Sequence, residues 1–265
     1  MSSPLLVRPR TNDADGIVQR ITPETAGWGF VGFEAIDLPD NGTLSRTDEH
    51  NELCLVILTG TAEVTAGGTA FGAIGGRASV FDPEPWSVYV PPRATLDVRA
   101  RGPVELALCS SPAAGRYKPR LIPPNEVGEL TRGTGTNTRY VRNILPDTAE
   151  AETLLVVEVV TPGGHWSSYP PHKHDTASPT ETYLEETYYH RLRRGSGFAV
   201  QRVYTDDGAL DETMAVSDRD VVLVPKGYHP VGAPHGFDLY YLNVMAGPDR
   251  RWKFTMAPDH AHLPY

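Results

Sequence analysis

The sequence has almost no cysteine and no long run of apolar residues. Cys54 and Cys109 are the two cysteines among 265 residues, and they form no CxxC pair. Two isolated thiols in hydrophobic runs are typical of reduced core residues, which argues against a disulfide framework and a catalytic cysteine. No apolar stretch approaches the length that spans a bilayer, and the first residues lack the apolar region of a signal peptide. We therefore expect a cytoplasmic protein with no membrane partner.

Basic runs are missing as well. The chain has 24 Lys and Arg against 33 Asp and Glu, a net charge of −9, and a pI near 5.5. Without a basic run or face, nucleic acid is not expected as a partner. An acidic surface also repels an anionic substrate, so such a substrate needs a local Arg or Lys in its pocket.

Helical periodicity is scarce, and short runs of β-branched and aromatic residues take its place. These runs are bounded by Gly, Pro, Asp or Asn, and the chain has 25 Gly and 24 Pro, which favour many short turns. Examples are ELCLVILTG, SVYVPP and VELALCSS in the first half, and TLLVVEVVT, DVVLVPK and LYYLNVM in the second. The pattern predicts an all-β fold of the sandwich or barrel type.

The two halves of the chain resemble each other in the order of these runs. Glu52 in the first half stands in the position of Glu186 in the second, at the head of a predicted strand. The first half supplies only His50 before that strand and has no His-x-His pair. We therefore predict a duplicated barrel: an N-terminal domain over residues 1–125 without metal ligands, and a C-terminal metal-binding domain over residues 126–265.

A His-x-His pair follows two prolines in the stretch YPPHKHD. Alternate residues of a strand point to the same face, so His172 and His174 project together while Lys173 points away. Glu185 and Glu186 lie across a polar loop, at the head of the next predicted strand. A carboxylate at that position can face the two imidazoles.

A third imidazole follows a tight turn in VPKGYHP, at His229. Three His and one Glu leave coordination positions open on a Zn, Fe, Mn or Ni ion, as a catalytic metal requires. The ordered set of His-x-His, Glu and Pro-x-Gly-x-His is far more specific than any one of its members. A second pair, His260 and His262, is interpreted as part of a solvated terminus.

This set resembles the cupin metal signature, although the loop after His174 is longer than usual and the turn before His229 is one residue tighter. The resemblance extends over HKHD, YLEETYYHRL, GFAVQRVYTDDGALDET, DVVLVPKGYHPVGAPHGFDLYYLNVMAGP and RWKFTMAPDHAH. There the chain is similar to the 5-deoxy-glucuronate isomerase family, bicupins of inositol catabolism related to 5-keto-4-deoxyuronate isomerase. The similarity covers most of the chain and is strongest from Thr161 to His260. It implies two tandem β-barrel or jelly-roll domains.

The resemblance also implies a set of ligands and a reaction. It places the metal ligands on His172, His174, Glu186 and His229, with Glu185 as the alternative to its neighbour. It implies one divalent metal ion per chain, with zinc as the first expectation and manganese or iron as alternatives. The implied substrate is a uronate-type sugar acid, because the family's reaction in carbohydrate metabolism converts 5-deoxy-glucuronate to 5-dehydro-2-deoxy-gluconate.

That aldose–ketose isomerisation suits a metal site, because a Lewis acid acidifies the C–H group beside a carbonyl and a base then moves the proton. No organic cofactor is needed, in agreement with the absence of a nucleotide-binding loop or nucleophile elbow. The candidates for the base are Glu185, Tyr188, His190, Tyr204, Tyr240 and Tyr241. If Glu186 faces the metal, alternation puts Tyr188 and His190 on the same inner face. Substrate-binding roles are predicted for Arg202, Arg142, Gln201, Lys226 and Asn243.

Two other functions stay open at this point. The same ligand set suits an Fe(II)-dependent cupin dioxygenase, which would consume oxygen and leave uronates unchanged. A non-enzymatic sugar-binding bicupin is a third reading, because a fold does not determine a function. The presence of the ligand set in one half only argues against that third reading. An exposed barrel face also leaves a homo-oligomer open.

Overall fold

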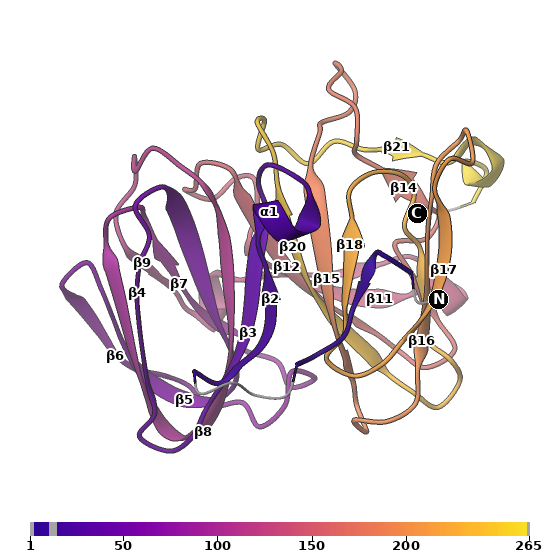
Figure 1. The fold of residues 1–265 in the computed structure, drawn as a ribbon. Coiled ribbons are helices and arrows are strands. Elements are labelled where there is room, and N and C mark those ends of the chain that lie inside the picture. Colours follow the sequence, from indigo (N-terminus) through magenta and orange to yellow (C-terminus); the bar gives the residue numbers. More distant parts are fainter. Residues whose placement is uncertain (1–2, 11–14, 264–265) are drawn as a thin grey trace. The chain divides into compact units, whose positions relative to one another are not determined.

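The computed structural model describes residues 3–10 and 15–263, and within them strands dominate (Figure 1). The one α-helix in this part of the chain is α1 (Pro23–Ala26). Three short 3-10 helices accompany it: η1 (Pro124–Glu126), η2 (Gly135–Asn137) and η3 (Pro258–His260). None of the helices in the described part is long and apolar enough to cross a bilayer.

The chain divides into two compact units that are each discontinuous in sequence. The unit that we call the N-terminal unit comprises residues 10–128 and 144–156. The C-terminal unit comprises residues 1–9, 129–143 and 157–265. The domain boundary expected after residue 125 stays a prediction.

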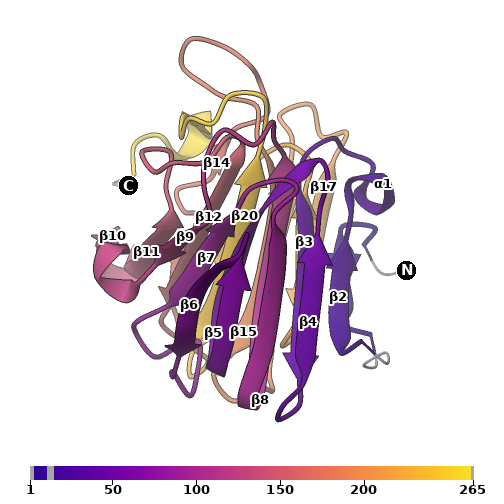
Figure 2. The ribbon, with the colours of Figure 1, turned by 90° about the vertical axis from the view of Figure 1, so that its left-hand side faces the viewer.

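Eight strands of the N-terminal unit form an antiparallel sheet in the order β2-β3-β8-β5-β7-β9, with β4 paired to β8 and β6 paired to β5 (Figure 2). They are β2 (Ile17–Ile21), β3 (Gly32–Leu38), β4 (Thr43–Thr47), β5 (Asn51–Ala66), β6 (Thr69–Gly75), β7 (Trp86–Val90), β8 (Thr95–Pro112) and β9 (Arg120–Ile122). Alternate residues of β5, such as Leu53, Leu55 and Ile57, enter one apolar core. Cys54 and Cys109 lie opposite each other on β5 and β8 as buried free thiols, as the sequence predicts.

Glu52 is a fully buried carboxylate in this unit, and hydrogen bonds satisfy it. The Tyr89 hydroxyl donates to it over 2.7 Å. The backbone N–H groups of Glu152, Thr153 and Leu154 donate to it over 2.9, 2.7 and 2.8 Å. Since its oxygens are engaged by donors, Glu52 anchors residues 152–154, at the start of β12, to β5.

A seven-stranded sheet in the order β1-β18-β15-β20-β12-β11-β10 belongs largely to the C-terminal unit, which also contains a four-stranded sheet in the order β13-β19-β16-β17 and the pair β14-β21. The first sheet consists of β1 (Leu6–Val7), β10 (Gly128–Arg132), β11 (Arg139–Leu145), β12 (Leu154–Thr161), β15 (Glu185–Leu192), β18 (Val221–Val224) and β20 (Leu239–Ala246). The others are β13 (Trp166–Ser167), β14 (His172–Lys173), β16 (Ala199–Tyr204), β17 (Asp211–Val216), β19 (Val231–Gly232) and β21 (Thr255–Met256). The predicted all-β class is confirmed.

Strand β15 is the element that orients the site. It is paired on both edges, with Glu186 opposite Val224 of β18 and Met245 of β20. Pairing on both sides prevents a slip in register, and a slip of one residue would turn every side chain to the other face. Alternation therefore places Glu186, Tyr188 and His190 on one face of β15.

Candidate metal centre

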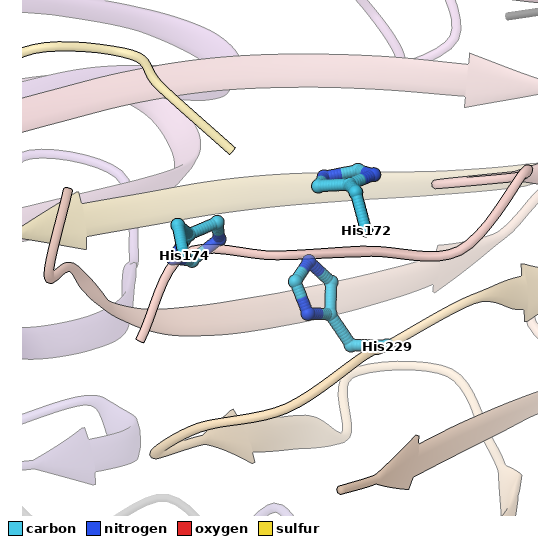
Figure 3. Close-up of side chains that lie close together, drawn as sticks. All are labelled: His172, His174 and His229. Atoms are coloured by element: carbon cyan, nitrogen blue, oxygen red, sulfur yellow. The ribbon is translucent and has the colours of Figure 1, made fainter. Parts of the chain in front are cut away.

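Three imidazoles converge in the C-terminal unit (Figure 3). One ring nitrogen from each of His172, His174 and His229 lies within 4.8 Å of the others, and all three side chains are buried. The Oε2 atom of Glu186 lies 3.2 Å from Nε2 of His174 and 3.2 Å from Nε2 of His229. The four side chains that the sequence singles out therefore meet at one place.

Backbone carbonyls determine which nitrogen of two imidazoles points inward. Nδ1 of His174 lies 3.0 Å from the Leu184 carbonyl oxygen, and Nδ1 of His229 lies 2.9 Å from the Gly227 carbonyl oxygen. An N–H at Nδ1 that donates to these carbonyls leaves Nε2 as the lone-pair donor, as in metal-binding histidines. The turn before His229 requires glycine, because Gly227 has a φ of 88° and a Cβ there would lie 2.3 Å from the Tyr204 carbonyl oxygen.

Burial controls the protonation of the cluster. It is the main reason why the pKa of His172 lies well below its ordinary value and the pKa of His229 is also lowered. Burial acts in the same direction on His174, but the hydrogen bond to Glu186, the charge of Glu186 and the Leu184 carbonyl together outweigh burial and raise the pKa of that imidazole. His172 and His229 are thus neutral donors, as metal binding requires of an imidazole.

The donor set fits a divalent metal ion. Nε2 of His229 is buried without a hydrogen bond of acceptable geometry, although it lies beside the Glu186 carboxylate. A buried lone pair without a donor is costly, whereas a cation in that place would satisfy it. Three imidazole nitrogens and one carboxylate oxygen are ligands that zinc, manganese and iron accept, and they leave coordination positions open.

The structure distinguishes the two adjacent glutamates. Glu186 faces the imidazoles, whereas Glu185 occupies the opposite face of β15 and accepts a hydrogen bond of 3.3 Å from the Tyr183 hydroxyl. Both carboxylates are buried, so exposure does not separate them. The direction of the side chains makes Glu186 the member of the cluster and removes Glu185 from it.

Two tyrosines lie beside the ligands, each paired with a serine. The Tyr188 hydroxyl lies 2.8 Å from Oγ of Ser168, and the Tyr241 hydroxyl lies 2.5 Å from Oγ of Ser167. The ring centroid of Tyr188 is 5.8 Å from that of His229 and 4.8 Å from that of Tyr241. Sequence reasoning missed both serines, and their position just before the His-x-His pair was the only local signal.

Burial determines the protonation states of Tyr188, Tyr241 and His190. Burial, followed by the charge of Glu186, raises the pKa of Tyr188 well above its ordinary value, and burial raises the pKa of Tyr241 to about 12. Both phenols therefore stay protonated at neutral pH. Burial lowers the pKa of His190 to about 4, so its imidazole is neutral, and its Nε2 lies 2.9 Å from Oε1 of Gln201.

Two of the predicted substrate-binding cations, Arg202 and Arg142, pair with carboxylates of the chain. Arg202 is exposed, and its Nε lies 2.7 Å from Oδ1 of Asp211. Nη1 of Arg142 lies 2.8 Å from Oε1 of the buried Glu158. Lys226 is exposed on the turn before the third imidazole. The substrate-binding roles of these three residues stay predictions.

The predicted amide side chains lie beside the inner face of β15. Gln201 contacts His190 as described, and a hydrogen bond from Asn243 acts on Tyr188.

The remaining two tyrosine candidates for the base have other partners. The Tyr240 hydroxyl donates to Oε2 of Glu158 over 2.9 Å, and Tyr204 packs on Tyr228 with ring centroids 5.2 Å apart.

The C-terminal segment brings aromatic side chains against the imidazoles. The Trp252 ring lies 5.3 Å from that of His174, and the Phe254 ring lies 4.9 Å from that of His172, between centroids. Pairing of β21 with β14 holds this segment in place. Apolar rings at this position restrict the access of water to the donor set.

Asp175 ties two parts of the site together. Its Oδ2 accepts a hydrogen bond of 2.8 Å from the Gly227 backbone N–H, and its Oδ1 lies 2.7 Å from Nζ of Lys173. Nζ of Lys173 also lies 2.9 Å from Oε1 of Glu181, so Lys173 points away from the imidazoles as predicted. Asp175 thus joins the loop that carries the first two imidazoles to the turn that carries the third.

Comparison with known proteins gives a family and several relatives. The model of the KduI/IolB family matches residues 5–263. A 5-deoxy-glucuronate isomerase of Geobacillus kaustophilus is 53% identical over 260 residues, which are 97% of this chain and 94% of that protein. The 5-deoxy-glucuronate isomerase of Bacillus subtilis strain 168 is 45% identical over 262 residues, 97% of each chain.

Solved structures agree with this family and with the fold. The crystal structure of an IolB-like protein from Salmonella typhimurium LT2 aligns with a TM-score of 0.94 and 50% identity, over 97% of this chain and 98% of that one. An oxalate decarboxylase of Bacillus subtilis with Mn(II) centres aligns with a TM-score of 0.66 and 14% identity, over 97% and 80%. At such low identity the second likeness concerns the fold alone.

Proposed function

The chain belongs to the KduI/IolB family, and on this premise we propose that it converts 5-deoxy-glucuronate to 5-dehydro-2-deoxy-gluconate with the help of one divalent metal ion. The isomerase activity is supported by relatives that carry this name at 45% and 53% identity over nearly the whole chain. The metal requirement is supported by one observation, the buried meeting of three imidazoles with Glu186. A cytoplasmic location stays a prediction.

The reaction moves protons and leaves the oxidation state of the whole molecule unchanged. A proton leaves the hydroxyl-bearing carbon beside the aldehyde and is added to the aldehyde carbon, while the hydroxyl proton passes from one oxygen to the other. The site must therefore hold a base near the carbon atoms and hydrogen-bond donors near the two oxygens.

We propose His172, His174, Glu186 and His229 as the ligands, with zinc as the first choice and manganese or iron as alternatives. A bound divalent ion supplies Lewis acidity, which polarises the carbonyl and acidifies the neighbouring C–H bond. The carbonyl acceptors behind His174 and His229 keep their Nε2 atoms directed inward.

Tyr188 and Tyr241 are proposed as the donors to the substrate oxygens. Because their phenols stay protonated, each can donate a hydrogen bond to an oxygen on which negative charge grows. Ser168 and Ser167 hold the two hydroxyls in place, and each can exchange a proton with its tyrosine. A preorganised donor needs no reorientation during the reaction.

His190 is proposed as the base for the carbon-bound proton. Its Nδ1 is buried and has no hydrogen-bond partner among the described residues. A pKa of about 4 leaves the imidazole in the base form at neutral pH, with a basicity close to that of a carboxylate. Its ring stacks on that of Tyr188 at 5.9 Å, which links the base to the proposed donor.

The test combines metal analysis with an assay of ketose formation from 5-deoxy-glucuronate. Wild-type protein should contain about one divalent ion per chain, and His174→Ala should lose both the ion and turnover. His50→Ala is the matched control, since His50 is exposed in the N-terminal unit. Full activity of metal-free protein would refute the metal requirement, and oxygen consumption without ketose formation would favour a dioxygenase.

A further inference from the structure

The proposed base, His190, accepts a proton only at the ring nitrogen that carries its lone pair. A neutral imidazole has one N–H group and one lone pair, and the hydrogen bond at one nitrogen decides which form is present. The residue that contacts the imidazole therefore decides which nitrogen can take the proton from carbon.

Gln201 is the residue in contact with the imidazole of His190. It is fully buried on β16, where it is paired with Met214 of β17 and Val231 of β19. Its Oε1 lies 2.9 Å from Nε2 of His190, and its Nε2 lies 3.4 Å from the carbonyl oxygen of His229. The amide thus joins the proposed base to the backbone of a proposed metal ligand.

The His229 carbonyl determines the orientation of the Gln201 amide. A carbonyl oxygen accepts hydrogen bonds and cannot donate them, so the NH2 end of the amide faces it. The reversed amide would bring two oxygens together without a donor between them, which is costly in a buried place. The amide oxygen is therefore the atom that faces His190.

The oriented amide in turn determines the tautomer of His190. Because an amide oxygen only accepts, Nε2 of the imidazole must carry the N–H group. The lone pair then lies on Nδ1, which is buried and has no hydrogen-bond partner among the residues that the structure describes. The contacts of one glutamine thus leave the base with its accepting nitrogen unoccupied.

We propose, on the basis of the proposed function, that Gln201 is a positioning residue that keeps His190 in the Nε2–H form with Nδ1 available to the carbon-bound proton. Nδ1 takes this proton from the hydroxyl-bearing carbon and returns it to the aldehyde carbon, so no proton is gained or lost. Oε1 of Gln201 accepts from Nε2 throughout, and its hydrogen bond strengthens while the imidazole is positively charged. This role differs from the substrate contact that the sequence predicts for Gln201.

The test compares Gln201→Met with wild type, because methionine keeps the length of the side chain and removes the amide. Gln19→Met is the matched control, since Gln19 is equally buried, on β2 of the N-terminal unit. Nitrogen NMR of the zinc-loaded, histidine-labelled protein reports which ring nitrogens are protonated, and His190→Gln identifies the resonances of His190. Bound metal, melting temperature, kcat and KM for 5-deoxy-glucuronate are measured for each protein.

In the wild type, the resonances of His190 should show a protonated Nε2 and an unprotonated Nδ1. In Gln201→Met, the Nε2–H proton should move upfield and exchange faster with solvent, because its acceptor is gone. The value of kcat should fall by about 10- to 100-fold, the range for partners that orient functional histidines. KM and bound metal should stay close to wild type, and the control should match wild type throughout.

A protonated Nδ1 in the wild-type protein would overturn the proposal, and this measurement does not depend on a variant that folds. An unchanged kcat in Gln201→Met would also overturn it. So would a fall in kcat together with loss of the metal, which indicates a purely structural role. A wild-type protein that forms no ketose would instead contradict the proposed function, whereas the resonances of His190 test Gln201 without turnover, so the two failures are distinguishable.

Discussion

Exchange of the two adjacent glutamates for glutamine should affect metal binding at Glu186 and leave it unchanged at Glu185. Glu186→Gln removes the one anionic group of the proposed ligand set while keeping its size. Glu185→Gln makes the same chemical change on the opposite face of β15, where the side chain accepts from Tyr183. The two variants make the same chemical change, so a difference in metal binding between them reports the face of β15 on which each side chain lies.

The expected magnitude follows from the contacts of Glu186. Its Oε2 lies 3.2 Å from two of the three imidazoles, so it belongs to the inner donor set. Groups that only support metal ligands already account for about 10- to 100-fold in metal affinity. A ligand with the negative charge should account for at least about 100-fold, or about 3 kcal/mol. Glu185→Gln should bind metal as wild type does.

Metal affinity is measured by competition with a chromogenic chelator near neutral pH, with zinc and manganese in turn. Circular dichroism and melting temperature check that both variants fold. Loss of metal from Glu185→Gln, with retention in Glu186→Gln, would mean that the assigned faces of β15 are reversed. Equal affinity in all three proteins would exclude the cluster as the metal site.

Three further predictions concern the surroundings of the ligands. Asp175→Ala should weaken metal binding by about 10- to 100-fold in the same competition assay, because it releases the Gly227 turn; unchanged affinity would contradict this. Trp252→Ala should speed chelator-driven metal release about tenfold in stopped-flow measurements, because water gains access; an equal rate would argue against a cover. His190 has a pKa of about 4 when folded and about 6.5 when unfolded, so the free energy of unfolding should fall by about 3 kcal/mol as pH drops through that window. Urea unfolding of His190→Gln should lack this component, and a parallel pH profile would refute the assignment.

Local pattern was enough to predict the class of fold and the three imidazoles of the cluster. Strand alternation puts His172 and His174 on one side, and it does so whatever the strand pairs with. The glycine turn before His229 is equally local, since its positive φ suits glycine alone. Short β-rich runs between turn residues are likewise a property of neighbours in the chain.

The choice between Glu185 and Glu186 required the pairing of β15 with β18 and β20, which joins residues far apart in sequence. The surroundings of the predicted substrate-binding cations also depend on contacts between distant segments. Arg142 pairs with Glu158, a partner that no motif indicates.

The sequence by itself therefore indicated the three imidazoles of the candidate metal centre, because alternation and turn geometry act over a few neighbours. Only the tertiary structure decided which of their neighbours face them, among them the aromatic rings of Trp252 and Phe254. Those contacts join segments that are distant in the chain, and they depend on strand register and burial, which no local pattern contains.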